Sequence, residues 1–231
     1  MGKAFLLKLN ASTYYANIGL KHGIYNTLPW VVYGYRDGGA DCLTLLKKIM
    51  QLPDCAKMTH PRLITLPKIT SINRFEVVKN KIVVVNPYSA NRVQSDCQRF
   101  LENIIPYLLE KGFVVYSNVI GDQQVLPGTD KLDCTKQELY VIADEIPLII
   151  SNRSGIMDYL VTTKAHKMIV YPPNRIKPFR DMYGMKHWDV DNVTEFLIDE
   201  TQEMSAEIRT FLDVFTDGIN NHLAYRKEGL I

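Results

Sequence analysis

The sequence predicts an α/β fold built on a doubly wound, mostly parallel sheet, and three observations support this prediction. Ile82-Val83-Val84-Val85 is a continuous β-branched run, which is typical of a parallel strand buried on both faces. Helical periodicity follows between residues 100 and 109. Further apolar runs end at residues 116, 150 and 171, with helical patterns between them. Strand and helix therefore alternate, as βαβ units with right-handed crossovers require.

The chain is predicted to divide near residue 80. Residues 1–80 contain one or two weak strand candidates among aromatic, glycine-punctuated stretches, so we expect a partial domain and a linker there. Residues 81–231 are expected to form a Rossmann-like domain with four strands, and the loop at 118–133 is expected to be polar and irregular. After Pro178 the chain is expected to be mainly helical, with an amphipathic helix around residues 204–215.

Composition excludes several classes of function. A net charge of +2, without a stripe of Lys or Arg, argues against nucleic-acid binding. The four cysteines and five histidines show no metal-ligand spacing, so no metal is expected. Reduced thiols and the lack of an apolar run of about 18 residues predict a cytoplasmic protein, with any membrane contact peripheral. No nucleophile elbow, Walker lysine loop or GxGxxG follows a predicted strand.

Three loops are expected to meet at the carboxyl ends of the parallel strands, where ligands bind in such sheets. They are Asn86–Arg92, Asn118–Asp133 and Ser151–Gly155. The first loop is predicted to form one wall of a cleft, through Asn86, Tyr88, Ser89 and Arg92, with Arg92 as a second positive charge.

The loop after the third main apolar run is the predicted anion site. Ser154 is a suitable N-cap, Gly155 permits close approach to the backbone, and Arg153 offers a bidentate positive charge. A diphosphate is the natural guest at such a helix start. Asp158 is expected either to touch a sugar hydroxyl or to restrain Arg153. The alternative is a capped helix with a solvated arginine and an ordinary helix-start carboxylate.

Residues 81–173 resemble the donor-binding, carboxyl-terminal half of a GT-B glycosyltransferase, closest in pattern to the heptosyltransferase-like group. The shared features are Asn86-Pro87 followed by Arg92, the TxxEL segment Thr135-Lys136-Gln137-Glu138-Leu139, and Ser154-Gly155-Ile156-Met157-Asp158 leading to Pro172-Pro173. The resemblance implies that the start of the helix after Ser154-Gly155 holds the donor diphosphate. It also implies that Gly121, Thr135 and Glu138 lie near the base and ribose.

Two departures limit what the resemblance implies. Arg153 stands where the group usually has an acidic residue, and Asp158 where it has histidine, so the donor sugar is left open. The general base of the family often comes from the amino-terminal half, so the catalytic residues remain unassigned.

The implied function is a nucleotide-sugar-dependent glycosyltransferase of cell-surface polysaccharide synthesis. The nucleotide sugar would be a substrate, no cofactor would be needed, and the acceptor would be a saccharide or a lipid-linked molecule. Because residues 1–80 are too short for a second Rossmann-like half, we expect a partial enzyme whose cleft a partner domain or oligomer completes. Two alternatives stay open: a phosphosugar-binding isomerase-type domain, and a non-catalytic nucleotide-sugar-binding module that needs a partner half.

Overall fold

The computed structural model describes residues 67–73, 75–88, 97–172, 190–199 and 203–227, together with Pro53, Cys55, Met185 and Thr201. The chain divides into two compact units, and every helix and strand named below belongs to the unit formed by 59–176 and 190–231. Most of the predicted partial domain at 1–80 lies outside the described residues. The division of the chain near residue 80 therefore stays a prediction.

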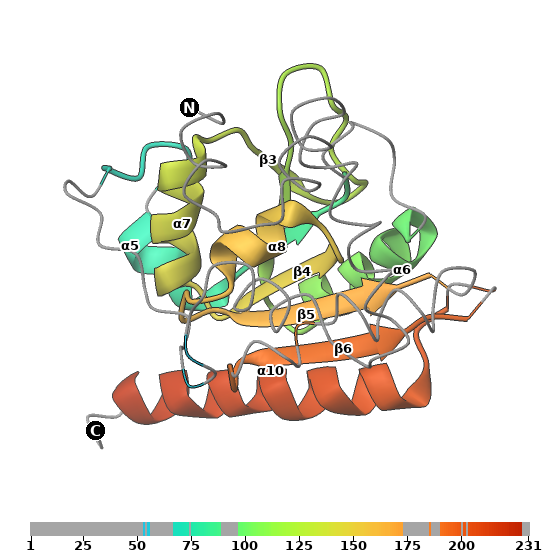
Figure 1. Ribbon diagram of the computed structural model, residues 1–231. Coiled ribbons are helices and arrows are strands. Elements are labelled where there is room, and N and C mark those ends of the chain that lie inside the picture. Colours follow the sequence, from blue (N-terminus) through green and yellow to red (C-terminus); the bar gives the residue numbers. More distant parts are fainter. Residues whose placement is uncertain are drawn as a thin grey trace, which may run out of the picture. The chain divides into compact units, whose positions relative to one another are not determined.

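A six-stranded parallel sheet forms the centre of this unit, in the order β3-β2-β1-β4-β5-β6 (Figure 1). The strands are β1 (Ile82–Asn86), β2 (Val114–Asn118), β3 (Asp130–Leu132), β4 (Leu148–Asn152), β5 (His166–Tyr171) and β6 (Val193–Leu197). The order reverses between β1 and β4, so the predicted α/β, Rossmann-like doubly wound fold is confirmed.

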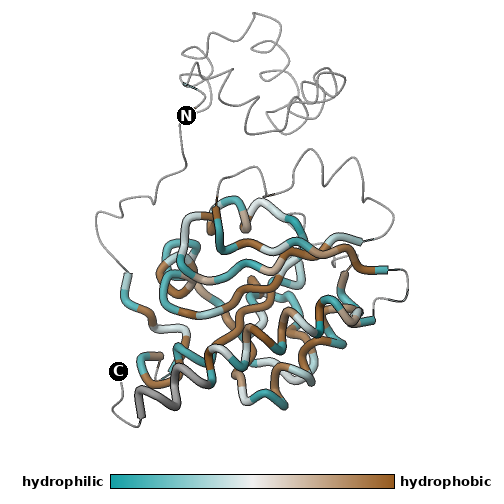
Figure 2. The backbone as a smooth tube through the Cα atoms, turned by 90° about the horizontal axis from the view of Figure 1, so that it is seen from below, coloured by the Kyte–Doolittle hydropathy of each residue, from teal (hydrophilic) through white to brown (hydrophobic). Residues whose placement is uncertain are grey.

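Strand β1 lies in the middle of the sheet and is buried along its whole length. Its Val84 pairs with Tyr116 of β2 on one side and with Ile149 of β4 on the other. A strand with neighbours on both edges and helices over both faces has no solvated side, which explains the unbroken run of β-branched residues. Figure 2 shows this concentration of apolar residues in the central strands.

Helices cover both faces of the sheet. The elements are α5 (Phe75–Val78), the 3-10 helix η1 (Lys79–Lys81), α6 (Gln98–Glu110), α7 (Lys136–Glu145), α8 (Gly155–Leu160) and α10 (Ala206–Lys227). Helices α7 and α8 lie over one face of the sheet and α10 runs across the other (Figure 1). The predicted amphipathic helices at 100–109 and 204–215 thus correspond to α6 and α10.

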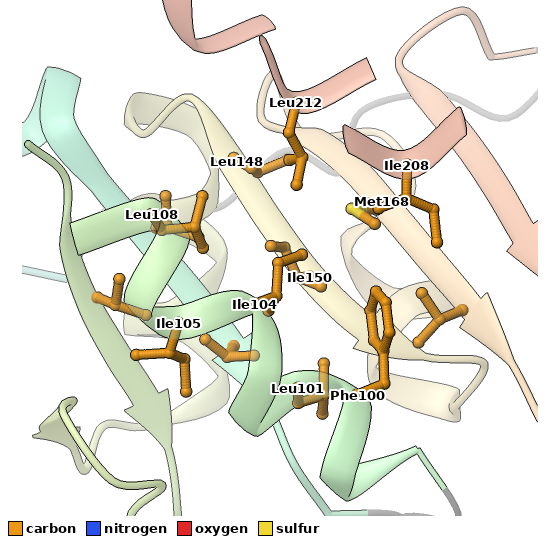
Figure 3. Close-up of a cluster of buried hydrophobic side chains, with 14 of the residues drawn as sticks. Phe100, Leu101, Ile104, Ile105, Leu108, Leu148, Ile150, Met168, Ile208 and Leu212 are labelled. Atoms are coloured by element: carbon orange, nitrogen blue, oxygen red, sulfur yellow. The ribbon is translucent and has the colours of Figure 1, made fainter. Parts of the chain in front are cut away.

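An apolar core lies where α6 and α10 meet the sheet (Figure 3). The side chains of α6 at the predicted period are fully buried there, namely Phe100, Leu101, Ile104, Ile105 and Leu108. They face Leu148 and Ile150 of β4, while Ile208 and Leu212 reach the same cluster from α10. Successive side chains of a strand lie on opposite faces of the sheet. Those of Val83 and Val85 therefore belong to this core, and those of Val84 and Asn86 lie on the face under α7 and α8.

Two strands were not predicted. The expectation that 118–133 is an irregular loop is wrong at β3, and the expectation of a mainly helical chain after Pro178 is wrong at β6. Both are edge strands of the sheet. Edge strands are partly solvated, so β3 exposes Asp130 and Lys131 and β6 carries Thr194 and Glu195. Neither segment therefore shows the apolar run by which the central strands were recognised.

Lys167 is a buried cation within the sheet. It lies near the amino end of β5, is 0% exposed, and donates a hydrogen bond from Nζ to the carbonyl of Thr163. That carbonyl also accepts a hydrogen bond from Asn192 Nδ2 at 2.7 Å. Burial lowers the pKa of the Lys167 ammonium to about 8, although the negative charge of Asp144 opposes the shift. Removing a charge from water without a full set of partners is costly.

Lys167→Met should therefore stabilise the protein at pH 7. Below pH 8 the folded state holds a charged ammonium in an apolar interior, a cost of about 1–3 kcal/mol that methionine does not carry. Between pH 8 and the ordinary pKa of 10.5, the folded state binds fewer protons than the unfolded state, so wild-type stability rises with pH. Urea unfolding should show a gain for Lys167→Met at pH 7 that shrinks by about pH 10.

The matched control is Lys164→Met, because the Lys164 side chain is 75% exposed and its removal has little desolvation to relieve. Lower stability of Lys167→Met at pH 7 would show that the hydrogen bond to Thr163 outweighs the cost of burying the charge. The carbonyl of Thr163 keeps its Asn192 partner in either case.

Candidate functional site

Three neighbouring strands end in polar side chains at the carboxyl edge of the sheet. Asn86 is the last residue of β1 and pairs with Ser151 of β4. On the other side Val85 pairs with Ser117, which brings Asn118, the last residue of β2, level with Asn86. We call Asn118, Asn86 and Ser151 the polar row. It spans the point between β1 and β4 where the strand order reverses, and ligands of doubly wound sheets bind at this point.

Hydrogen bonds link two members of the polar row to each other and one of them to helix α8. Asn118 Nδ2 donates to Asn86 Oδ1 at 2.7 Å, and Asn86 Nδ2 contacts Met157 Sδ at 3.8 Å. Asn86 is only 2% exposed and Ser151 is fully buried, with its hydroxyl donating to the carbonyl of Asn152 at 2.8 Å. The row therefore lies on the face covered by α7 and α8.

The turn between β4 and α8 holds the predicted anion site. Ser154 occupies the N-cap position of α8 with an extended backbone, as predicted, but the prediction that its side chain caps the helix is wrong. Its hydroxyl oxygen is buried and has no hydrogen-bond partner among the described residues. Gly155 is exposed, and a Cβ atom added there would meet nothing within 4 Å. This turn thus combines an unused hydroxyl with open space beside the first amide groups of a helix.

Arg153 is braced within the same turn. Its Nη2 donates to Asp158 Oδ1 at 2.5 Å and its Nη1 to the carbonyl of Ser154 at 3.0 Å. The Arg153 side chain is 8% exposed and that of Asp158 is 36% exposed. Of the alternatives for this pair, the restraint of Arg153 by Asp158 is observed, and the solvated arginine is wrong. The positive charge at the turn is therefore partly balanced before any ligand arrives.

Tyr88 joins the loop after β1 to the loop between β2 and β3. Its hydroxyl donates to the carbonyl of Gln124 at 2.9 Å and accepts from the amide of the same residue at 3.1 Å. Gly121 lies in that second loop with φ +63°, a conformation that glycine adopts without strain, and its carbonyl accepts from Lys131 Nζ at 3.4 Å. Ser89 and Arg92, the other predicted wall residues, lie outside the described residues.

The start of α7 is organised by Thr135 and Glu138. Thr135 is the N-cap, as predicted, and its hydroxyl accepts from the amide of Glu138 at 3.1 Å. Glu138 is 7% exposed, and its Oε1 accepts from the amides of Thr70 and Ser71 at 2.7 and 2.9 Å and from the Ser71 hydroxyl at 2.8 Å. This carboxylate therefore fastens residues 70–71 to α7. A contact of Glu138 with a nucleotide base stays a prediction.

The electrostatics at this helix start follow from burial and hydrogen bonding. Burial alone would raise the pKa of the Glu138 carboxyl, but the hydrogen bonds from Ser71 and Thr70 outweigh it and hold the pKa below the ordinary value. Burial raises the pKa of the neighbouring Cys134 thiol to about 12, with smaller effects from the charges of Glu138 and Asp133. Cys134 is therefore a protonated thiol at neutral pH.

Asn118 and Ser151 were not predicted as site residues, because the sequence analysis placed both only within loops. A signal was present. In each of these three strands a small polar residue follows an apolar run, directly in β1 and β4 and after Ser117 in β2. Such residues are unfavourable in a buried strand unless they meet a partner or a ligand. That the three residues lie side by side across the sheet depends on strand register, which the sequence does not show.

Searches for related proteins and for other kinds of site add no identification. No known family model matches the sequence, and no curated protein matches it. Within the described ranges, no cluster of three or more His, Cys, Asp or Glu side chains is arranged to hold a metal ion. None of the described helices is both long and apolar enough to cross a membrane.

Glu138→Gln should destabilise the protein at neutral pH by about 1–2 kcal/mol, because the three donors lose a charged acceptor. A carboxyl with a lowered pKa in the folded state contributes stability above its ordinary pKa and loses that contribution as the pH falls through the folded value. The difference between wild type and Glu138→Gln in urea unfolding should therefore be full at pH 7 and decline below about pH 4. Glu110→Gln, an exposed change on α6, is the control. A pH-independent difference would contradict this account.

Proposed function

We propose that the chain is a nucleotide-sugar-dependent glycosyltransferase whose donor binds at the carboxyl edge of the sheet between β1 and β4. The observation that carries the proposal is the reversal of strand order at this point, together with the polar row that ends the strands there. The resemblance of residues 81–173 to a GT-B donor-binding half supplies the reaction class. The acceptor, a saccharide or lipid-linked molecule of polysaccharide synthesis, follows from that resemblance alone.

The donor diphosphate would bind at the β4–α8 turn. Helix α8 has only six residues, so individual hydrogen-bond donors would matter more than its dipole. The donors would be the Ser154 hydroxyl, which has no partner among the described residues, and the first amide groups of α8. No atom of the described residues fills the space beside Gly155. The Arg153 guanidinium, held in place by Asp158, would add a charge-assisted hydrogen bond.

This arrangement suits a reaction in which a nucleoside diphosphate leaves. Negative charge develops on the diphosphate as the bond to the sugar breaks, and fixed donors stabilise that charge without having to reorganise. No metal would be required for this stabilisation. We assign no catalytic base, since the resembled enzymes often supply it from the other half of the molecule.

The test is calorimetry of the full chain with nucleoside diphosphates, inorganic pyrophosphate and sugar monophosphates. Binding of nucleoside diphosphates in preference to sugar monophosphates is expected, and the reverse preference would favour a phosphosugar-binding domain. Incubation with nucleotide sugars and candidate acceptors, followed by mass spectrometry, then separates an enzyme from a non-catalytic binding module. We expect poor transfer by the chain alone. Failure to bind any nucleoside diphosphate would overturn the proposal.

Arg153→Ala and Asp158→Asn should change diphosphate affinity in opposite directions. Arg153→Ala removes a charged donor and should weaken nucleoside diphosphate binding by roughly 1.5–3 kcal/mol. Asp158→Asn keeps a polar side chain but removes the negative charge that competes with the phosphates, so it should strengthen binding. Calorimetry at two ionic strengths measures both effects, and salt should reduce each of them. If the pair only braces the turn, both variants would weaken binding.

Gly155→Ala should weaken diphosphate binding by about tenfold, about 1.4 kcal/mol, while leaving the fold intact. The added methyl group meets no atom of the described residues within 4 Å, so it would intrude on a ligand that approaches the backbone. The control is Gly218→Ala in α10, where an added Cβ atom also meets nothing within 4 Å. Both variants should retain wild-type melting behaviour, and only Gly155→Ala should lose affinity. Equal affinity of the two variants would contradict the proposal that the phosphates bind at this turn.

A further inference from the structure

We propose that Asn118, positioned by Asn86, is a specificity-determining residue that binds a ribose hydroxyl group of the donor nucleotide. This inference rests on the proposed function. It assigns the ribose of the donor to Asn118, the member of the polar row that lies on β2. Both residues are at the carboxyl ends of neighbouring strands, and their amides share a hydrogen bond of 2.7 Å.

The hydrogen bonds within the protein leave this amide pair incompletely used. Asn118 Nδ2 donates to Asn86 Oδ1, whereas Asn118 Oδ1 accepts no hydrogen bond from the described residues. Among the described residues, Asn86 Nδ2 has only the sulfur of Met157, at 3.8 Å, and a thioether is a weak acceptor. The pair therefore offers one strong acceptor and an incompletely satisfied donor. A hydroxyl group can both donate and accept, so a sugar matches this combination.

Burial argues against a purely structural pair. Asn86 is 2% exposed at the end of the run Ile82 to Val85, where another apolar residue would cost less to bury. A buried amide pair kept only for structure would be expected to satisfy its remaining groups within the protein. Asn118 is partly exposed and is the last residue of β2, at the edge of the sheet where ligands bind.

Asn118 is not expected to bind the phosphates, because of its lack of charge and its distance from the β4–α8 turn. Neither asparagine is charged, and the side-chain oxygen Oδ1 of Asn118 would repel a phosphate oxygen. Two strand spacings, roughly 10 Å, separate β2 from β4, where the proposed phosphate donors follow the strand. A donor with its diphosphate at the β4–α8 turn would therefore place an uncharged part of the nucleotide, the ribose, toward Asn118.

The test compares ligands that differ by one hydroxyl. Calorimetry of the full-length chain would use a nucleoside diphosphate, its 2′-deoxy and 3′-deoxy forms, and inorganic pyrophosphate. Wild type should discriminate against at least one deoxy form by about three- to tenfold, the effect of one hydrogen bond. Asn118→Ala should lose that discrimination and should bind pyrophosphate as wild type does. Asn118→Ser, which retains a hydroxyl, should keep part of the discrimination. Asn103→Ala, an exposed change on α6, should behave as wild type.

Each outcome bears on either the inference or the proposed function. Unchanged discrimination in Asn118→Ala, or an equal loss of affinity for pyrophosphate and every nucleotide, would overturn the inference alone. Equal affinity of wild type for pyrophosphate, the nucleoside diphosphate and both deoxy forms would also overturn the inference, because the protein would then make no specific contact with the nucleoside. Absence of nucleoside diphosphate binding in wild type would overturn the proposed function, and the inference with it.

Discussion

The burial of strand β1 on both edges and both faces is the constraint on which the rest of the unit depends. Hydrogen bonds to β2 and β4 satisfy its backbone, so its valines can be enclosed without leaving polar groups unpaired. Helix α6 and α10 then close one face, and α7 and α8 the other. Because the helices leave each strand at its carboxyl end, the connecting loops gather at one edge, and polar chemistry is concentrated there.

That edge is held together by contacts between segments far apart in the chain. Tyr88 fastens the loop after β1 to Gln124, and Glu138 fastens residues 70–71 to the start of α7. Arg153 is held to Asp158 across the first turn of α8. The contacts of Glu138 and Arg153 satisfy polar groups that would otherwise be costly at a partly buried edge. Hydrogen bonds and an ion pair therefore restrain the segments that carry the residues proposed to bind a donor, which favours preorganised binding.

Two polar groups near this edge are treated differently by the fold. The Glu138 carboxylate accepts three hydrogen bonds through Oε1 and serves to position a segment. The Ser154 hydroxyl is equally shielded from solvent, yet no described residue bonds to it. Buried polar groups in folded proteins are nearly always partnered, and the missing partner of this hydroxyl is one reason why we propose that the donor phosphates bind at this turn.

The sequence by itself determined the central elements of this protein. The valine run of β1, the periodicity of α6 and the turn at Arg153 to Gly155 depend on patterns of apolar and polar residues within short stretches of the chain. Tertiary structure alone decided the edge strands β3 and β6, whose polar residues carry no local signal. It also decided the alignment of Asn118, Asn86 and Ser151, because strand register is a relation between segments far apart in the chain that no single stretch encodes.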